Sequence, residues 1–198
     1  MNRRQFVGTS AALVTGGGLL SYATVIEPHW LEITPRDLTV ANLPAALEGM
    51  TLAQVSDLHS CTYVDEDYLI ESLTRVKAMR PDIVVFTGDF ITWELDKKAA
   101  DKIAQLERVL AHFPHGRLAT LAILGNHDYG HNWTDGQVAE IVVSLAEKAG
   151  ITVLRNQLAN VGGLDIVGID DLWSGRADTT KALALRTGVA TLALCHNP

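Results

Sequence analysis

Residues 83–89 of the chain read IVVFTGD. The first five side chains are β-branched or aromatic, which is typical of a short strand buried on both faces of a sheet. Directly after this run, Gly88 permits a tight turn and Asp89 places a carboxylate at the end of the strand. The stretch therefore predicts an α/β sheet that carries polar side chains on the edge where its strands end.

The same arrangement recurs on both sides of this stretch. Residues 50–56 are a strand candidate that leads into Asp57-Leu-His59, and residues 119–124 are a second buried strand that leads into the sequence GNHD, residues 125–128. A strand over residues 189–194 runs into His196. Because the carboxyl ends of parallel strands lie on one edge of a sheet, we expect these polar segments to meet there.

Three amphipathic helices are expected between the strands. The first follows Asp65 and ends before Pro81, the second spans about residues 97–113, and the third follows Thr134 or Asp135. Each has one apolar stripe, so each is expected on the outside of a sheet. The stripes are Leu69, Leu73, Val76 and Met79; Ile103, Leu106, Leu110 and Phe113; Val138, Ile141, Val142 and Leu145.

The C-terminal part of the chain is expected to be rich in strands, at residues 151–154, 164–168 and 189–194. Alternating apolar residues over 31–34 and 38–40 also predict a short hairpin near the N-terminus. Helices that alternate with strands and then give way to successive strands predict an α/β layered sandwich with parallel strands early in the chain.

The side chains expected at the carboxyl edge form a set of metal ligands. Carboxylate oxygen, amide oxygen and imidazole nitrogen suit divalent ions such as Mn, Fe or Zn, and the absence of cysteine from the set argues against a structural zinc site. Each motif alone is also a common turn or helix cap. Their order, each after a strand, favours one shared site. Its candidate residues are Asp57, His59, Asp89, Asn126, His127, Asp128 and His196.

The motifs Asp-x-His, Gly-Asp, Gly-Asn-His-Asp and a later His resemble the signature of the calcineurin-like metallophosphoesterases, over roughly residues 50–198. The resemblance implies a layered α/β/β/α sandwich. It also implies that Asp57 and His59 bind a first metal ion, that Asp89 bridges two ions, and that Asn126 and His196 bind the second.

By the same resemblance, His127 lies beside the substrate and stabilises charge or protonates the leaving oxygen, and Asp128 orients His127. The implied reaction is hydrolysis of a phosphoester by a hydroxide held between two divalent metal ions. The sequence leaves open whether the substrate is a phosphodiester, a phosphomonoester or a pyrophosphate. An apolar groove near Trp93, Trp133 or Trp173 would fit a lipid-linked or cell-envelope substrate, although each tryptophan also fits ordinary packing.

One departure from the family pattern bears on activity. The family closes with a Gly-His-x-His segment, and this sequence stops at Pro198 before any such segment. The resemblance therefore predicts a sandwich that is incomplete at its C-terminus, either because the chain is a C-terminally truncated fragment or because it has lost two ligands. Two alternatives stay open, a catalytically inactive scaffold domain of this fold and a protein that binds one metal ion.

Residues 1–27 form a segment distinct from the expected domain over residues 28–198. Arg3-Arg4 precede an apolar, glycine-rich run, and the first acidic residue is Glu27. This order resembles a twin-arginine signal peptide and predicts export across the bacterial inner membrane, to the periplasm or the outer face of the membrane. A retained N-terminal anchor, with peripheral membrane association, is the alternative.

The charge balance restricts the partners of the protein. There are 16 Lys and Arg residues against 23 Asp and Glu residues, a formal net charge of −7. An acidic surface of this kind repels phosphate backbones, so we expect no nucleic-acid partner. It suits a protein that gathers carboxylates to hold cations.

Overall fold

The computed structural model describes residues 15–60, 64–93, 99–188 and 190–197, and the chain divides into two units between Asp37 and Leu38. In the first unit residues 15–21 are helical and lead into the π-helix η1 (Tyr22–Ile26) and the 3-10 helix η2 (Glu27–His29). Residues 1–14 of the predicted leader lie outside the described part of the chain. Among the described residues no helix has the length and hydropathy needed to cross a bilayer.

The predicted hairpin over residues 31–40 is wrong, because that stretch contains no strand. Ile33 and Leu38 are 46% and 61% exposed. Two short strands with no sheet to join are marginal in water, so alternating apolar residues are not sufficient to pair them.

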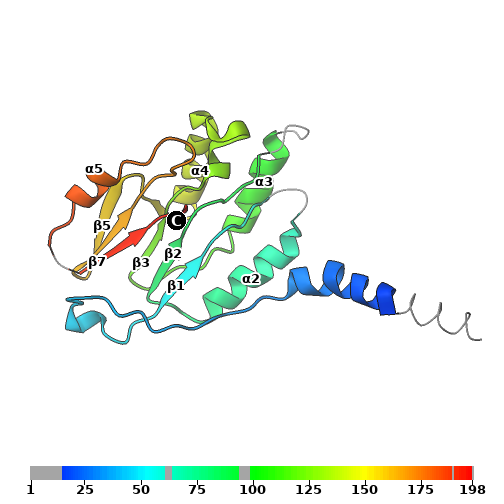
Figure 1. The fold of residues 1–198 in the computed structure, drawn as a ribbon, viewed down its shortest axis with the longest axis horizontal. Coiled ribbons are helices and arrows are strands. Elements are labelled where there is room, and N and C mark those ends of the chain that lie inside the picture. The colour runs from blue at the N-terminus through cyan, green and yellow to red at the C-terminus, as the bar shows by residue number, and fades with distance from the viewer. Residues whose placement is uncertain (1–14, 61–63, 94–98, 189, 198) are drawn as a thin grey trace, which may run out of the picture. The chain divides into compact units, whose positions relative to one another are not determined.

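The second unit contains a four-stranded sheet in the order β1-β2-β3-β4, and every neighbouring pair is parallel (Figure 1). The residues of β2 are buried on both faces, as the sequence predicts. Val84 and Phe86 face one core, and Ile83 and Val85 face another. The strands are β1 (Leu52–Val55), β2 (Ile83–Phe86), β3 (Ala119–Ala122) and β4 (Thr152–Val153).

Three helices cover one face of this sheet, and their buried side chains share a core with Val84 and Phe86. The Asp65 carboxylate caps α2 by accepting the N–H groups of Asp67 and Tyr68. Asp135 caps α4 in the same way, so the second of the two predicted cap residues is the one used. The helices are α2 (Glu66–Ala78), α3 (Ala99–Leu110) and α4 (Gly136–Lys148).

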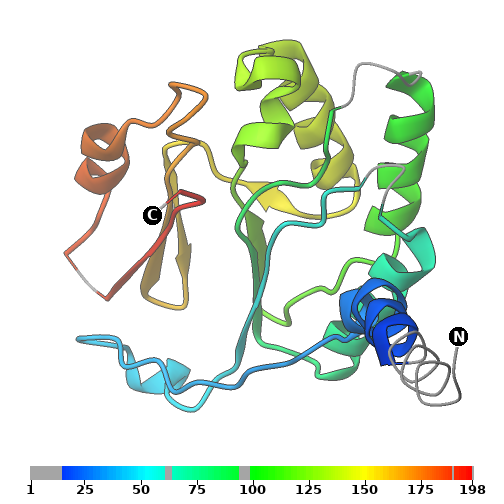
Figure 2. The same cartoon turned by 45° about the vertical axis from the view of Figure 1, so that its right-hand side comes forward.

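A second sheet of three strands, in the order β5-β6-β7, packs against the other face. Its β5 (Gln157–Val161) and β6 (Leu164–Gly168) form an antiparallel hairpin, and β7 (Thr191–Leu194) runs parallel to β6. The helix α5 (Thr179–Ala184) covers the outer face of this sheet (Figure 2). The layered α/β/β/α sandwich is therefore confirmed.

Some details differ from the expectations. The sequence analysis did not predict β5 or α5. β5 is only partly buried and mixes polar with apolar residues, and α5 has six residues, too few for a clear period.

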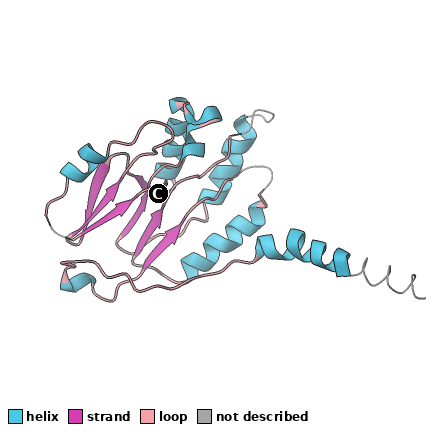
Figure 3. Ribbon diagram, viewed as in Figure 1, coloured by secondary structure: helices cyan, strands magenta, loops and turns pink. Residues whose placement is uncertain are grey.

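Ile141 is 37% and Met79 is 53% exposed, although both were expected in inner stripes. In α4 the small residues Ala139 and Ala146 face the core, which rotates Ile141 outward. Figure 3 shows the helices on the outside of both sheets.

Candidate metal centre

The loops that leave β1 and β2 continue to run side by side beyond the strands. The Asp57 N–H donates to the Gly88 carbonyl at 3.0 Å, and the His59 N–H donates to the Asp89 carbonyl at 3.0 Å. Asp57, His59 and Asp89 have φ angles of 56°, 44° and 63°. Left-handed backbone is costly for residues other than glycine and gathers at functional sites. The contacts of these loops therefore hold the three side chains in place.

The Asp128 carboxylate joins the loops after β2 and β3. It lies on the short helix η4 (Asn126–Tyr129), is fully buried, and accepts the N–H groups of Asp89 at 2.9 Å, Gly125 at 2.9 Å and Ile91 at 3.2 Å. Burial, assisted by the charge of Asp89, raises the pKa of Asp128 to about 8 against the lowering effect of these donors. Within the described residues, the structure records no hydrogen bond between Asp128 and the His127 ring. The predicted role of Asp128 towards His127 stays a prediction.

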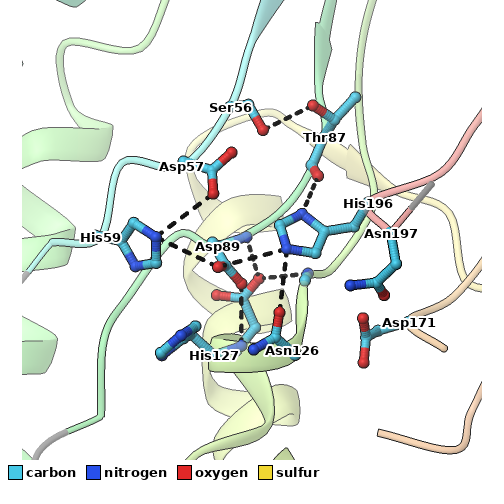
Figure 4. A network of polar contacts seen from close by, with 12 residues as sticks. Ser56, Asp57, His59, Thr87, Asp89, Asn126, His127, Asp171, His196 and Asn197 are labelled. Atoms are coloured by element: carbon cyan, nitrogen blue, oxygen red, sulfur yellow. Dashed lines mark hydrogen bonds and ion pairs between the residues drawn. The ribbon is translucent and has the colours of Figure 1, made fainter. Parts of the chain in front are cut away.

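Asp89 occupies the middle of the cluster and is 3% exposed. Its Oδ1 accepts the His127 N–H at 3.0 Å, while its Oδ2 lies 3.4 Å from His59 Nε2 and 3.4 Å from His196 Nε2 (Figure 4). Burial opposes ionisation, but the hydrogen bond and charge of His196 hold the pKa of Asp89 below its usual range. One carboxylate oxygen therefore faces both histidines, as a bridging ligand requires.

The His196 ring is held in the tautomer that a metal ligand needs. Its Nδ1 lies 2.7 Å from the Thr87 carbonyl oxygen, which can only accept, so Nδ1 carries a proton. Its Nε2 lies 3.2 Å from Asn126 Oδ1 and faces Asp89. The hydrogen bond to Asp89 raises the pKa of His196 to about 9, against desolvation. Its Nε2 thus points to a place where the oxygen atoms of Asn126 and Asp89 converge, which is the environment that a cation fits.

His59 is oriented in a similar way. Its Nδ1 lies 2.7 Å from Thr92 Oγ1, and its Nε2 lies 3.4 Å from Asp57 Oδ1. A hydrogen bond on the far ring nitrogen is the usual means of fixing a metal-binding histidine. The Asp57 side chain is 53% exposed, so this side of the centre is open to solvent.

The ligand atoms fall into two groups of three, and the atoms of each group lie within 4.8 Å of one another. The groups are His59, Asp89 and His127, and Asp57, Asp89 and His196. Asp89 belongs to both, which agrees with its expected bridging position. The other members are grouped differently from the resemblance, which assigns Asp57 and His59 to one ion and Asn126 and His196 to the other. Which ion each residue would hold therefore stays a prediction.

The structure thus brings every candidate residue to one edge of the sheet. His127 lies at the rim, with its ring centroid 4.9 Å from that of His59 and 6.1 Å from that of Trp133. The carboxylate and imidazole donors fit divalent ions such as Mn, Fe or Zn.

The sequence analysis missed three residues at the site. Thr87 and Thr92 orient His196 and His59. Asp171 is 1% exposed and lies beside Asn197, and its Oδ1 has no hydrogen-bond partner in the described structure (Figure 4). Burial raises the pKa of Asp171, and the hydrogen bonds with Ser174 and the charge of His196 oppose this. Asp171 follows β6 closely, so the rule that found Asp57 and Asp89 could have found it.

An α/β/β/α sandwich with this donor set at the carboxyl edge defines a metal-binding enzyme centre. The sequence pattern of the calcineurin-like phosphoesterases matches residues 50–188, and the chain belongs to this family. It is therefore a metallophosphoesterase, a hydrolase of phosphoric esters from a family that binds divalent metal ions.

The chain is similar over its whole length to YkuE of Bacillus subtilis, described as an uncharacterized metallophosphoesterase, with 31% identity and 70% of YkuE covered. It is 24% identical to the phosphodiesterase YaeI of Escherichia coli, again over its whole length and 70% of that protein. Over 62% of this chain and 37% of the relative, it is 34% identical to the UDP-2,3-diacylglucosamine pyrophosphatase LpxG of Chlamydia trachomatis.

Proposed function

We propose that the protein hydrolyses a phosphodiester, phosphomonoester or pyrophosphate with the help of two divalent metal ions. The observation that supports two ions is Asp89 Oδ2, which lies 3.4 Å from an imidazole nitrogen on either side. Bound divalent ions supply Lewis-acid stabilisation of the phosphoryl oxygens and activation of water. The proposed ligands are Asp57, His59, Asp89, Asn126 and His196.

His127 is the proposed acid or charge-stabilising group of the reaction. Its backbone is fixed by Asp89 Oδ1 at 3.0 Å, and its ring stands at the half-buried rim against the His59 ring. A phosphoryl group at the centre would have its leaving oxygen within reach of this ring. Proton donation to a leaving oxygen by a positioned histidine is a common contribution to such reactions.

We also propose that the substrate is lipid-linked. The name of LpxG, a relative of this chain, gives a diacylated sugar nucleotide as the substrate of that protein. Peripheral association with a membrane and an exported location would bring the centre to substrates of this kind.

The first experiment is hydrolysis of bis(p-nitrophenyl) phosphate by chelator-treated protein with and without added Mn²⁺. We expect turnover that depends on the metal and falls at least about 100-fold in Asp89→Asn, because the oxygen shared by both ligand groups is lost. Asp101→Asn, an exposed aspartate on α3, is the matched control and should retain the activity. Bound metal counted by mass spectrometry should fall from two equivalents in Asp89→Asn.

The outcomes separate the alternatives. Two bound ions without turnover of any ester would support a scaffold of this fold. One bound ion in the wild-type protein would contradict the two-ion proposal. Turnover that is unchanged in Asp89→Asn would show that the proposed metal centre does not take part in the reaction.

Export is proposed from residues 1–27 and is tested separately. A reporter fused behind these residues should reach the periplasm of a bacterium with a twin-arginine pathway. Replacement of Arg3 and Arg4 by lysine should retain the reporter in the cytoplasm. Export that survives this replacement would contradict a twin-arginine signal.

A further inference from the structure

We infer that Trp133, Trp173 and Leu172 form a subsite for an aliphatic group attached to the phosphate of the substrate. We call these three residues the indole patch. The inference rests on the proposed function, because it concerns the group that a phosphoester would carry when it lies at the metal centre.

The indole patch is apolar and open to solvent. Trp133 and Trp173 are stacked, with ring centroids 5.3 Å apart and an angle of 26° between the planes. Trp133 is 37%, Trp173 is 59% and Leu172 is 58% exposed. Packing of the core does not account for two stacked indoles at the surface and an exposed leucine that precedes Trp173 in the chain, and such exposed apolar patches mark binding sites.

The patch adjoins the metal centre through His127. The Trp133 ring lies edge-on to the His127 ring at 6.1 Å, and the His127 ring lies edge-on to the His59 ring at 4.9 Å. A phosphoryl group at the centre would therefore place one of its substituents over the indoles. The patch is continuous with the site and not a separate surface.

The backbone holds Trp133 at this position against its own preference. Asn132 and Trp133 have φ angles of 57° and 60°. Left-handed backbone is unusual for a bulky residue, and it persists where the surrounding structure enforces it, often at ligand sites. Burial of the indole provides only part of the compensation, since more than a third of Trp133 stays exposed. This strain is an independent indication that the position of the ring matters.

The loop that carries Trp173 is fixed to the same short helix as His127. Tyr129 on η4 donates its hydroxyl to Asp170 Oδ1 at 2.6 Å. Asp171 then closes the turn, with Oδ2 accepting the Ser174 N–H and its carbonyl accepting the N–H groups of Arg176 and Ala177. The two indoles come from distant segments of the chain, yet both are anchored around η4. The patch is therefore preformed.

The geometry favours an aliphatic group over a nucleobase. The two indole rings are stacked on each other, so there is no gap between them into which a flat base could insert. An alkyl chain needs no parallel face and can pack along the indole edges and the Leu172 side chain. Trp93, the third tryptophan that the sequence suggests for an apolar groove, has the Lys102 ammonium 5.5 Å from its ring centroid and packs against the main core. It is not part of the patch.

The test compares two soluble esters that share one leaving group, methyl p-nitrophenyl phosphate and octyl p-nitrophenyl phosphate, both below the concentration at which micelles form. We expect kcat/KM of the Mn²⁺-loaded full chain to be at least tenfold higher for the octyl ester. In Trp173→Ala and Trp133→Ala the ratio of octyl to methyl should fall to about threefold or less. Equal values for the two esters in the wild-type protein would overturn the inference.

Two controls make this comparison specific. Met79→Ala removes another exposed apolar side chain, at the end of α2 that lies away from the metal centre, and should keep the wild-type ratio. The p-nitrophenyl ester of thymidine 5′-phosphate presents a base in place of the alkyl chain. If Trp173→Ala lowers the kcat/KM of this thymidine ester relative to the methyl ester, and leaves the ratio of octyl to methyl unchanged, the aliphatic assignment is wrong.

A binding measurement separates this inference from the proposed function. Asp89→Asn protein is titrated with octyl phosphate and with methyl phosphate, and tryptophan fluorescence is recorded. We expect octyl phosphate to bind at least tenfold more tightly and Trp173→Ala in the same background to remove that difference. If no ester is hydrolysed but this result holds, the proposed function fails and the subsite stands. No difference between the two phosphates would reject the subsite.

Discussion

Two fully buried aspartates, one at the carboxyl edge of the first sheet and one in the second sheet, each accept three hydrogen bonds with the side-chain carboxylate. Asp128, at the carboxyl edge of the first sheet, accepts only backbone N–H groups, and these belong to the loops after β2 and β3. Asp165, at the start of β6, accepts the N–H and hydroxyl of Thr187 at 2.7 and 2.9 Å and the Asn160 amide at 2.7 Å.

A buried carboxylate that accepts three hydrogen bonds has a different role in each of the two regions. Asp128 fixes loops whose backbone is left-handed and whose side chains are the proposed metal ligands. Asp165 fixes the end of β5 and the segment before β7, at the end of β6 away from the metal centre. Their pKa values move in opposite directions, up for Asp128 because of burial and down for Asp165 because of the Thr187 N–H and Asn160. A buried carboxylate marks a functional site through the loops it holds.

The largest expected effect is that of Asp128→Ala. The substitution leaves three buried N–H groups without an acceptor, and each costs roughly 1–3 kcal/mol, so the free energy of unfolding should fall by at least about 3 kcal/mol. The loops that carry Asp89 and Asn126 should also lose their mutual position. Urea unfolding measures the first effect, and metal content after dialysis measures the second.

Asp165→Ala is the matched control for Asp128→Ala. It also removes the acceptor of three hydrogen bonds, so the protein should be less stable. Its folded fraction at low temperature should still bind metal as the wild type does, because no metal-ligand loop is involved. If Asp128→Ala retained full metal binding while Asp165→Ala lost it, the distinction between the two regions would be wrong.

The first sheet and most of the site could be predicted because their signals are local. A run such as IVVFTGD combines a strand fully buried on both faces with the polar residue that follows it, so one segment reports both structure and ligand. Parallel pairing then brings the segments together without further information. Asp57, Asp89 and Asn126 were found in this way.

The second sheet carries weaker signals. β5 mixes polar with apolar residues along a partly buried strand, so neither a buried run nor a clean alternation is present. The pairing of Trp133 with Trp173 depends on two segments about forty residues apart, which no local period reports. The hydrogen bonds of Asp128 to backbone groups were hidden for the same reason, since an aspartate in a turn gives no sign of its partners.

An intermediate effect is expected for Tyr129→Phe, which cuts a hydrogen bond between the two regions. The Tyr129 hydroxyl donates to Asp170 Oδ1 at 2.6 Å, and Arg155 Nε binds the other oxygen at 3.1 Å. Loss of a hydrogen bond to a charged group should lower the free energy of unfolding by roughly 1.5–3 kcal/mol. The ring keeps its packing, so metal content should not change. Unaltered urea stability would show that the two regions do not depend on this bond.

The smallest effect is expected in the acid stability of Asp165→Asn. The Thr187 N–H and Asn160 hold the pKa of Asp165 below its usual range. Its stabilising contribution is then fully present above the unfolded pKa of about 3.9 and is lost as the pH falls through the lower folded value. The wild type should have a Tm a few degrees above that of the variant at pH 6, and the two should converge as the pH falls below about 4.

Thermal unfolding of chelator-treated protein across this range gives the measurement. Asp101→Asn, which removes an exposed carboxylate, should track the wild type at every pH. A Tm difference between wild type and Asp165→Asn that stays constant down to about pH 2.5 would mean that the Asp165 carboxylate contributes by shape and not by charge. A Tm difference that disappears on acidification would assign this part of the stability of the second sheet to an ionised buried group. Metal binding above pH 6 should be unchanged in Asp165→Asn, because this aspartate holds strands and not metal-ligand loops.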